Sequence, residues 1–271
     1  MSQAEEFLRD GNLQEALNTL QAAVRKQPAK AELRTFLFQL LSVLGNWDRA
    51  LAQLDVVGEL EAATLPMVHT YRSALACEAL RKEIYNGHKR PVLFGEPDQW
   101  IALLMEALAL DRAGNLAGAQ STREAAFEAA PATVGTIDGT AFSWIADADQ
   151  RLGPILECVM NGNFYWIPFY RIQRIQFDAP VDLRDFVWMP AEFTWVNGGQ
   201  AVGLIPTRYP DTENSGDAQL MLARKTDWRK VGAGVYTGLG QRMLVTDVGE
   251  YPLLDCRRIV LEVETPPGSI S

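Results

Sequence analysis

A seven-residue pattern that begins with Gly-Asn occurs three times in the first half of the chain. Residues 11–17 (GNLQEAL) recur 34 residues later as 45–51 (GNWDRAL), and the third copy, 114–120 (GNLAGAQ), lies a further 69 residues on. Gly and Asn accept the left-handed backbone that ends many helices, and the alanine shared by all three copies would let two helices approach closely. A period of 34 residues therefore predicts stacked helical hairpins.

In its period and its small-residue positions, this unit resembles the tetratricopeptide repeat. The alternative is an irregular helical bundle, because the second copy has Ala62 where a proline closes the other two units. Helical arrays of this kind rarely catalyse and instead hold a peptide or a helix on a curved surface. We expect helices at residues 3–10, 13–26, 31–44, 47–61, 66–86, 98–112 and 116–130, with a loop at 87–91 that interrupts the array.

After Pro131 the composition changes, because alanine-rich segments give way to aromatic and β-branched residues bounded by Gly, Pro, Asn and Asp. Asn161-Gly162 and Asn197-Gly198-Gly199 indicate hairpin turns. Five of the seven tryptophans lie in this half: Trp144, Trp166, Trp188, Trp195 and Trp228. Strands are expected at residues 164–167, 171–177, 193–196, 201–205, 242–248 and 257–263.

The two halves together predict an α+β chain. An N-terminal all-α, tetratricopeptide-like domain would cover residues 1–134. A mostly antiparallel β domain, a small barrel or sandwich, would cover residues 135–271, with a loose tail from residue 265.

Charge and cysteine usage narrow the function classes. The chain has 34 acidic and 25 basic residues, for a net charge of −9, and the excess of acids is spread over both halves. Nucleic-acid binding needs clustered cations, so it is disfavoured. The three cysteines form no CxxC pair, no apolar stretch is long enough for a membrane span, and the N-terminus lacks a secretory signal. We expect a cytoplasmic protein with neither a membrane partner nor a cofactor.

The run Asp147-x-Asp149-x-Arg151 is the strongest candidate site. It lacks the fifth- and sixth-position residues of a calcium loop, and no nucleophile motif lies near it. We expect Arg151 to pair with one or both carboxylates and to fix a bend where the halves meet, with a ligand site as the alternative. His69 and His88 have no metal-ligand spacing, and Gly232–Gly240 is expected to be a flexible turn between strands. No catalytic or metal-binding residue is predicted.

Several segments resemble the ImpE/TagJ (SciE-type) family, which comprises accessory proteins of bacterial type VI secretion systems. They are residues 142–157 (FSWIADADQRLGPILE), 162–169, 205–210 and 224–228, and the resemblance covers nearly the whole chain. One departure is Asp211, where the family pattern has glycine. The signature cluster consists of Asp147, Asp149, Arg151, Leu152, Gly153, Pro154, Trp166, Arg208, Tyr209 and Trp228.

The resemblance implies an adaptor that binds an N-terminal helix of the small contractile-sheath subunit and is linked to the unfoldase that recycles contracted sheath. Phe36 and Trp47, in the early repeats, are the candidate partner contacts, although both residue types also suit a helical core. The alternative function is an enzyme or small-molecule sensor with a site around Asp147, Asp149 and Arg151. The sequence does not indicate an oligomeric state.

Overall fold

The computed structural model describes residues 2–232 and 235–263. All seven predicted helices are present, and each end lies within one residue of its predicted position. They are α1 (Gln3–Arg9), α2 (Leu13–Lys26), α3 (Ala31–Val43), α4 (Trp47–Leu60), α5 (Leu65–Tyr85), α6 (Gln99–Arg112) and α7 (Leu116–Ala129), and a short α8 (Ala218–Met221) follows later in the chain.

The two residues of each Gly-Asn pair have different roles, whereas the prediction placed both at the end of a helix. Gly11, Gly45 and Gly114 adopt left-handed φ angles of 78°, 67° and 76°, as a helix C-terminus requires. The asparagines do not share this conformation and instead stand at the N-cap of the next helix. The side chains of Asn12 and Asn115 accept hydrogen bonds from backbone N–H groups in the first turn, where such donors lack partners within the helix.

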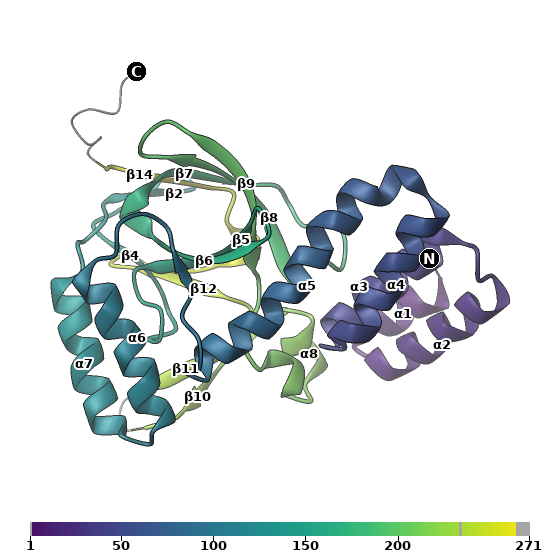
Figure 1. The fold of residues 1–271 in the computed structure, drawn as a ribbon, viewed down its shortest axis with the longest axis horizontal. Coiled ribbons are helices and arrows are strands. Elements are labelled where there is room, and N and C mark those ends of the chain that lie inside the picture. Colours follow the sequence, from purple (N-terminus) through teal and green to yellow (C-terminus); the bar gives the residue numbers. More distant parts are fainter. Residues whose placement is uncertain (1, 233–234, 264–271) are drawn as a thin grey trace.

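The helices lie on two sides of the β half (Figure 1). Helices α1–α4 pack together on one side, and α5 runs from this group across to the strands. The hairpin of α6 and α7 packs on the other side, so the array is interrupted after α5, as expected. Between α5 and α6, the short strand β1 (Val92–Leu93) pairs in parallel with β6 (Asn163–Pro168).

Nine strands form the main sheet, in the order β1-β6-β5-β9-β8-β7-β14-β2-β3, and all its pairs except β1–β6 are antiparallel. This strand order begins with β1 and ends with β3, and these two strands do not pair with each other. The sheet is therefore open, and the barrel alternative is wrong for the described residues. Two smaller sheets have the orders β13-β12-β4 and β10-β11. The strands are β2 (Gly135–Ile137), β3 (Thr140–Phe142), β4 (Ile145–Asp147), β5 (Ile155–Met160), β6 (Asn163–Pro168), β7 (Ile172–Phe177), β8 (Trp188–Trp195), β9 (Gln200–Pro206), β10 (Thr226–Lys230), β11 (Tyr236–Gly240), β12 (Met243–Thr246), β13 (Glu250–Pro252) and β14 (Arg258–Leu261).

The predicted strands are confirmed as β6, β7, β8, β9, β12 and β14, and both predicted hairpin turns join neighbouring strands. The prediction for Gly232–Gly240 is wrong in part, because Tyr236–Gly240 forms strand β11, while residues 233–234 lie outside the described residues. The predicted loose tail also lies outside them. Asp211, where the family pattern has glycine, takes a left-handed φ of 66°, a conformation that Asp tolerates better than most residues do.

One hydrophobic core runs through both halves. Leu40 and Val57 of the helices belong to the same buried cluster as Trp166 and Trp188 of the sheet. A second cluster, which includes Ile137 and Phe193, lies among the strands. Because burial of apolar surface is the main stabilising contribution, the two halves depend on each other for much of their stability. The division near residue 134 stays a prediction.

Candidate functional site

A buried ionic network joins α5 to the β half. Arg242, which is fully buried just before β12, forms ion pairs with Asp147 of β4 and with Glu157 of β5. Arg81 of α5 reaches Glu157 from the other side, with Nη2 2.8 Å from Oε2. The hydroxyl of Tyr209 donates to Asp147 over 3.0 Å. Two guanidinium groups therefore balance two carboxylates in the interior, which is the condition for burying such charges.

The two carboxylates differ in their pKa values. Burial alone would raise the pKa of Glu157, but Arg81 and Arg242 together hold it at about 2. Burial raises the pKa of Asp147 to about 6, against the lowering effect of Arg242. Glu157 therefore stays ionised wherever the protein is folded near neutral pH, whereas Asp147 is the member that can take up a proton.

We expect Glu157 to make the protein sensitive to acid. Its folded-state pKa of about 2 lies below the ordinary value of 4.5, so its stabilising contribution is complete above pH 4.5 and is lost as the pH falls toward 2. The loss is on the order of 3 kcal/mol. Urea unfolding of the native protein and of Glu157→Gln, followed from pH 7 to pH 2, measures it. The difference in unfolding free energy between the two should shrink over this window, and a constant difference would contradict the assignment.

Arg151 pairs with Asp149 and not with Asp147. Its Nε lies 2.9 Å from Asp149 Oδ1, and the other oxygen of Asp149 accepts the backbone N–H of Gly238 over 2.9 Å. The guanidinium group also lies over the ring of Tyr85, at the end of α5, with 4.7 Å between Cζ and the ring centroid. Arg151 is thus placed where the halves meet. Against the raising effect of burial, the charge and hydrogen bonds of Arg151 and the backbone N–H of Gly238 lower the pKa of Asp149.

The other signature residues differ in their burial. Leu152 and Trp166 are fully buried in the cluster shared by both halves. Trp228 is exposed, and its ring is tilted against the ring of the buried Tyr209, with 5.7 Å between the centroids. No ligand role follows from these four positions.

Two arginines of the β half cap helices of the helical half. Arg208 is almost fully buried and donates to the carbonyl oxygens of Val43, at the end of α3, and Met221, at the end of α8, over 2.7 and 2.5 Å. Arg224 donates to the carbonyl oxygen of Leu8 in α1 over 2.8 Å. The last carbonyls of a helix have no partner within it, so Arg208 satisfies groups at the ends of α3 and α8. The carbonyl oxygen of Leu8 accepts from Arg224 in addition to the backbone N–H of Gly11. Burial lowers the pKa of Arg208 to about 10.

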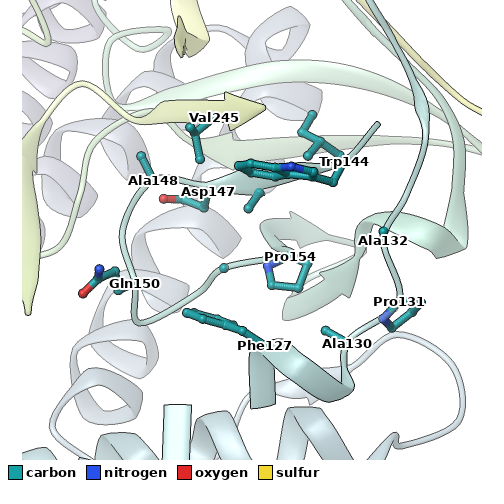
Figure 2. Close-up of a pocket in the computed structure, with 13 residues that line it drawn as sticks. Phe127, Ala130, Pro131, Ala132, Trp144, Asp147, Ala148, Gln150, Pro154 and Val245 are labelled. Carbon is teal, nitrogen blue, oxygen red and sulfur yellow. The ribbon is translucent and has the colours of Figure 1, made fainter. Parts of the chain in front are cut away.

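A pocket of about 430 Å³ lies beside the signature run, between the end of α7 and β4 (Figure 2). The signature residues Asp147, Gly153 and Pro154 contribute to its lining, together with the aromatic rings of Phe127 and Trp144. A Cβ on Gly153 would lie 2.3 Å from Phe127 Cε1, so glycine is required for this close approach. The pocket is predominantly apolar.

The two aspartates have no free oxygen to offer this pocket. Asp147 Oδ1 accepts from the backbone N–H of Asp149 and from Tyr209, and its Oδ2 is paired with Arg242. Asp149 is held by Arg151 and Gly238. A general acid or base must reach the proton that it transfers, so this arrangement gives no support to an enzyme at the signature run.

Other reactive groups are also held in unreactive settings. Within residues 2–232 and 235–263, no group of three or more His, Cys, Asp and Glu side chains is placed to hold a metal ion. Burial raises the pKa values of the Cys77 and Cys256 thiols to about 11 and 12, which disfavours the nucleophilic thiolate. None of the helices in the described part of the chain is long and apolar enough to cross a bilayer.

A groove runs between α4 and α5, and we call it the α4–α5 groove. Trp47 and Leu51 of α4 and Leu75, Ala76 and Ala79 of α5 line its main cavity of about 510 Å³. An adjoining cavity of about 280 Å³ shares Trp47 and Ala79 and extends along α5 to its end. Of the two candidate partner contacts, only Trp47 lies here.

The indole of Trp47 is partly exposed to the groove, and its ring centroid lies 5.9 Å from that of the buried Trp188. Phe36 is half-buried against the shared core and does not line the groove.

The sequence analysis missed Arg81, Glu157 and Arg242. A signal for one of them was present, because Glu157 is the single charged residue in the otherwise apolar strand Ile155–Met160, and a lone charge in a buried strand requires a partner. Arg81 and Arg242 gave no comparable signal, since arginine is ordinary on helices and at strand ends.

Comparison with known proteins identifies the family to which the chain is similar. Residues 139–260 match the ImpE protein family, and residues 7–75 match the tetratricopeptide repeat. The chain is 52% identical over 259 residues to the "Type VI secretion system accessory component TagJ" of Pseudomonas aeruginosa, which covers 96% of this chain and 91% of that protein. A crystal structure of a Vibrio parahaemolyticus protein superposes with a TM-score of 0.87 at 25% identity, covering 97% of this chain and 98% of the other.

Proposed function

The chain belongs to the ImpE family, and from this premise we propose that it is a non-enzymatic adaptor that acts in the cytoplasm as an accessory component of a type VI secretion system. Its main partner would be an N-terminal helix of the small contractile-sheath subunit, as the family resemblance implies. Holding this helix would link the protein to sheath assembly or to the unfoldase that recycles contracted sheath.

The α4–α5 groove is the observation that carries this proposal. A helix that docks in a groove needs an apolar floor and small residues that let the backbones approach. Trp47, Leu51 and Leu75 supply the apolar floor, and the exposed Ala76 and Ala79 are small residues three positions apart on α5. Such positions lie on the same face of a helix. The groove therefore suits an amphipathic helix better than a small polar ligand.

The enzyme or sensor alternative is weaker. This alternative rests on the cluster of Asp147, Asp149 and Arg151 in a tryptophan-rich half, and both carboxylates already accept hydrogen bonds from arginines and backbone donors. The neighbouring pocket offers mainly apolar and aromatic surface.

Titration with a labelled peptide that covers the first helix of the cognate small sheath subunit tests the adaptor. We expect saturable binding by fluorescence anisotropy. Ala76→Glu replaces a small residue of the groove by a larger, charged one and should weaken binding about tenfold or more, because a docked helix would bury that charge. The matched control is Ala52→Glu, which alters an exposed alanine of α4 outside the groove and should leave the affinity unchanged.

The possible outcomes test the identity of the partner separately from the position of its binding site. Absence of binding by the native protein at high micromolar peptide would contradict the sheath-helix proposal. Binding that Ala76→Glu and Ala52→Glu weaken equally, or not at all, would show that the helix docks elsewhere.

A further inference from the structure

Strand β10 is an exposed edge. It pairs with β11, and no other strand of the described residues pairs with it. Four of its five residues are exposed, and it lies with β11 on the outside of the molecule (Figure 1). Edges of this kind offer unpaired backbone groups to another strand.

The hydrogen-bond pattern shows which groups are free. Val231 N donates to Val235 O and Gln241 N donates to Lys225 O, so the odd-numbered residues of β10 face β11. The backbone groups of Thr226, Trp228 and Lys230 therefore face outward. One of them has a local partner, because the N–H of Trp228 donates to the carboxylate of Asp227 over 2.8 Å.

The sequence of β10, Thr226-Asp227-Trp228-Arg229-Lys230, is complementary to itself in the antiparallel direction. With Trp228 opposite its own copy, Asp227 lies opposite Arg229 of the second copy, and Arg229 lies opposite Asp227 of the second copy. The backbone groups of Trp228 face outward, so Trp228 and its copy form the hydrogen-bonded central pair. The Asp–Arg pairs therefore occupy the closer, non-hydrogen-bonded positions, where side chains interact best. Neither Asp227 nor Arg229 forms a salt bridge within the described residues.

We propose that β10 pairs with β10 of a second copy of this chain, joining the two β10–β11 hairpins into one four-stranded sheet around a twofold axis. On pairing, the Asp227 carboxylate leaves the Trp228 N–H and takes the Arg229 guanidinium of the second copy. The Trp228 N–H then donates to the second copy's backbone. A twofold interface of this type is closed, so it makes dimers and not filaments.

Charged edge strands in monomers usually prevent pairing. That protection depends on charges that repel an incoming strand, and the central three residues of β10 instead carry opposite charges two positions apart. In the self-paired strand, Asp227 and Arg229 therefore each lie opposite a side chain of the other charge.

Sedimentation equilibrium of the full chain tests the dimer, with masses compared with 30.1 kDa and its double. A single edge buries little surface, so concentrations up to about 200 μM are needed. Asp227→Arg and Arg229→Asp alter exposed side chains, and each makes both cross-strand pairs like-charged. Each should weaken dimerisation about tenfold or more.

An equimolar mixture of the two variants should restore a dimer. In the mixed pair, the two basic side chains at positions 227 and 229 of the Asp227→Arg chain lie opposite the two acidic side chains of the Arg229→Asp chain. The chain that carries both substitutions should restore it as well. A native protein that stays monomeric over the whole concentration range would overturn the proposal. So would a native dimer that the single substitutions leave intact, or a mixture that fails to associate.

Discussion

Replacing Arg242 with methionine should lower the free energy of unfolding by about 4 kcal/mol, since Asp147 would lose its cation in the interior while Glu157 would keep only Arg81. For a chain of this size the melting temperature should fall by about 10 °C. Methionine keeps much of the side-chain volume, so the loss reports on charge more than on a cavity. Urea unfolding at pH 8, together with calorimetry, measures both quantities.

The size of this loss should depend on pH in a defined direction. Burial already raises the pKa of Asp147 to about 6, and removal of Arg242 should raise it further. The carboxyl of the variant therefore takes up a proton at a higher pH than in the native protein, and the gap in unfolding free energy between the two should narrow from pH 8 to pH 5. Adding Asp147→Asn to the variant should recover part of the stability at pH 8, because the orphaned charge is gone.

Arg258→Met is the matched control for this experiment. Arg258 lies on β14, and its side chain is exposed and forms no ion pair within the described residues. Its replacement should change the unfolding free energy by less than about 0.5 kcal/mol. Equal losses for Arg242→Met and Arg258→Met would mean that the interior network contributes nothing specific.

Gly240→Ala should also destabilise the protein strongly, by about 3 kcal/mol. Gly240 has a left-handed φ of 82°, and a Cβ there would lie 2.2 Å from the carbonyl oxygen of Lys225. That oxygen belongs to the backbone and cannot move without shifting β10 away from β11. Gly240 also joins the hairpin to the rest of the β half, because its N–H donates to Thr212 over 2.9 Å and its carbonyl accepts from Tyr209 N over 3.0 Å.

Gly198→Ala separates the steric contribution to this loss of stability from the contribution of the left-handed backbone. Gly198 has nearly the same φ of 81° in the β8–β9 turn, but no atom lies within 4 Å of a Cβ placed there. It should lose only the conformational part, about 1 kcal/mol. Hydrogen exchange should show faster opening of β10 and β11 in Gly240→Ala alone. Similar stabilities for the two variants would remove the steric argument.

The helical half was predictable because its signals are local. Each hairpin is defined by a glycine, a capping asparagine and an alanine within seven residues, and helix ends followed directly from them. Most of the longer strands were predictable for the same reason, since turn residues such as Asn161 and Gly162 lie beside them. The six-residue strand β5 was missed, because it is buried on both faces and shows no alternation. The three-residue strands β2, β3 and β4 are too short to show a period of two.

The interior of the candidate site was not predictable in the same way. Arg81 and Glu157 are 76 positions apart, and Arg242 is a further 85 positions from Glu157. Their pairing depends on the crossing of α5 over the sheet, which no local pattern contains. The Asp149–Arg151 pair, only two positions apart, followed from spacing alone, and the choice between one carboxylate and two needed the structure.

The caps on α1 and α3 have a consequence for the order in which the chain matures. Arg224 closes the end of a helix 216 positions earlier in the chain, and Arg208 does the same across 165 positions. During synthesis these helices emerge before the β half, so their arginine donors become available only after most of the polypeptide has left the ribosome. The N-terminal helices are therefore completed only after the β half has been made, and an interrupted chain lacks both arginine caps.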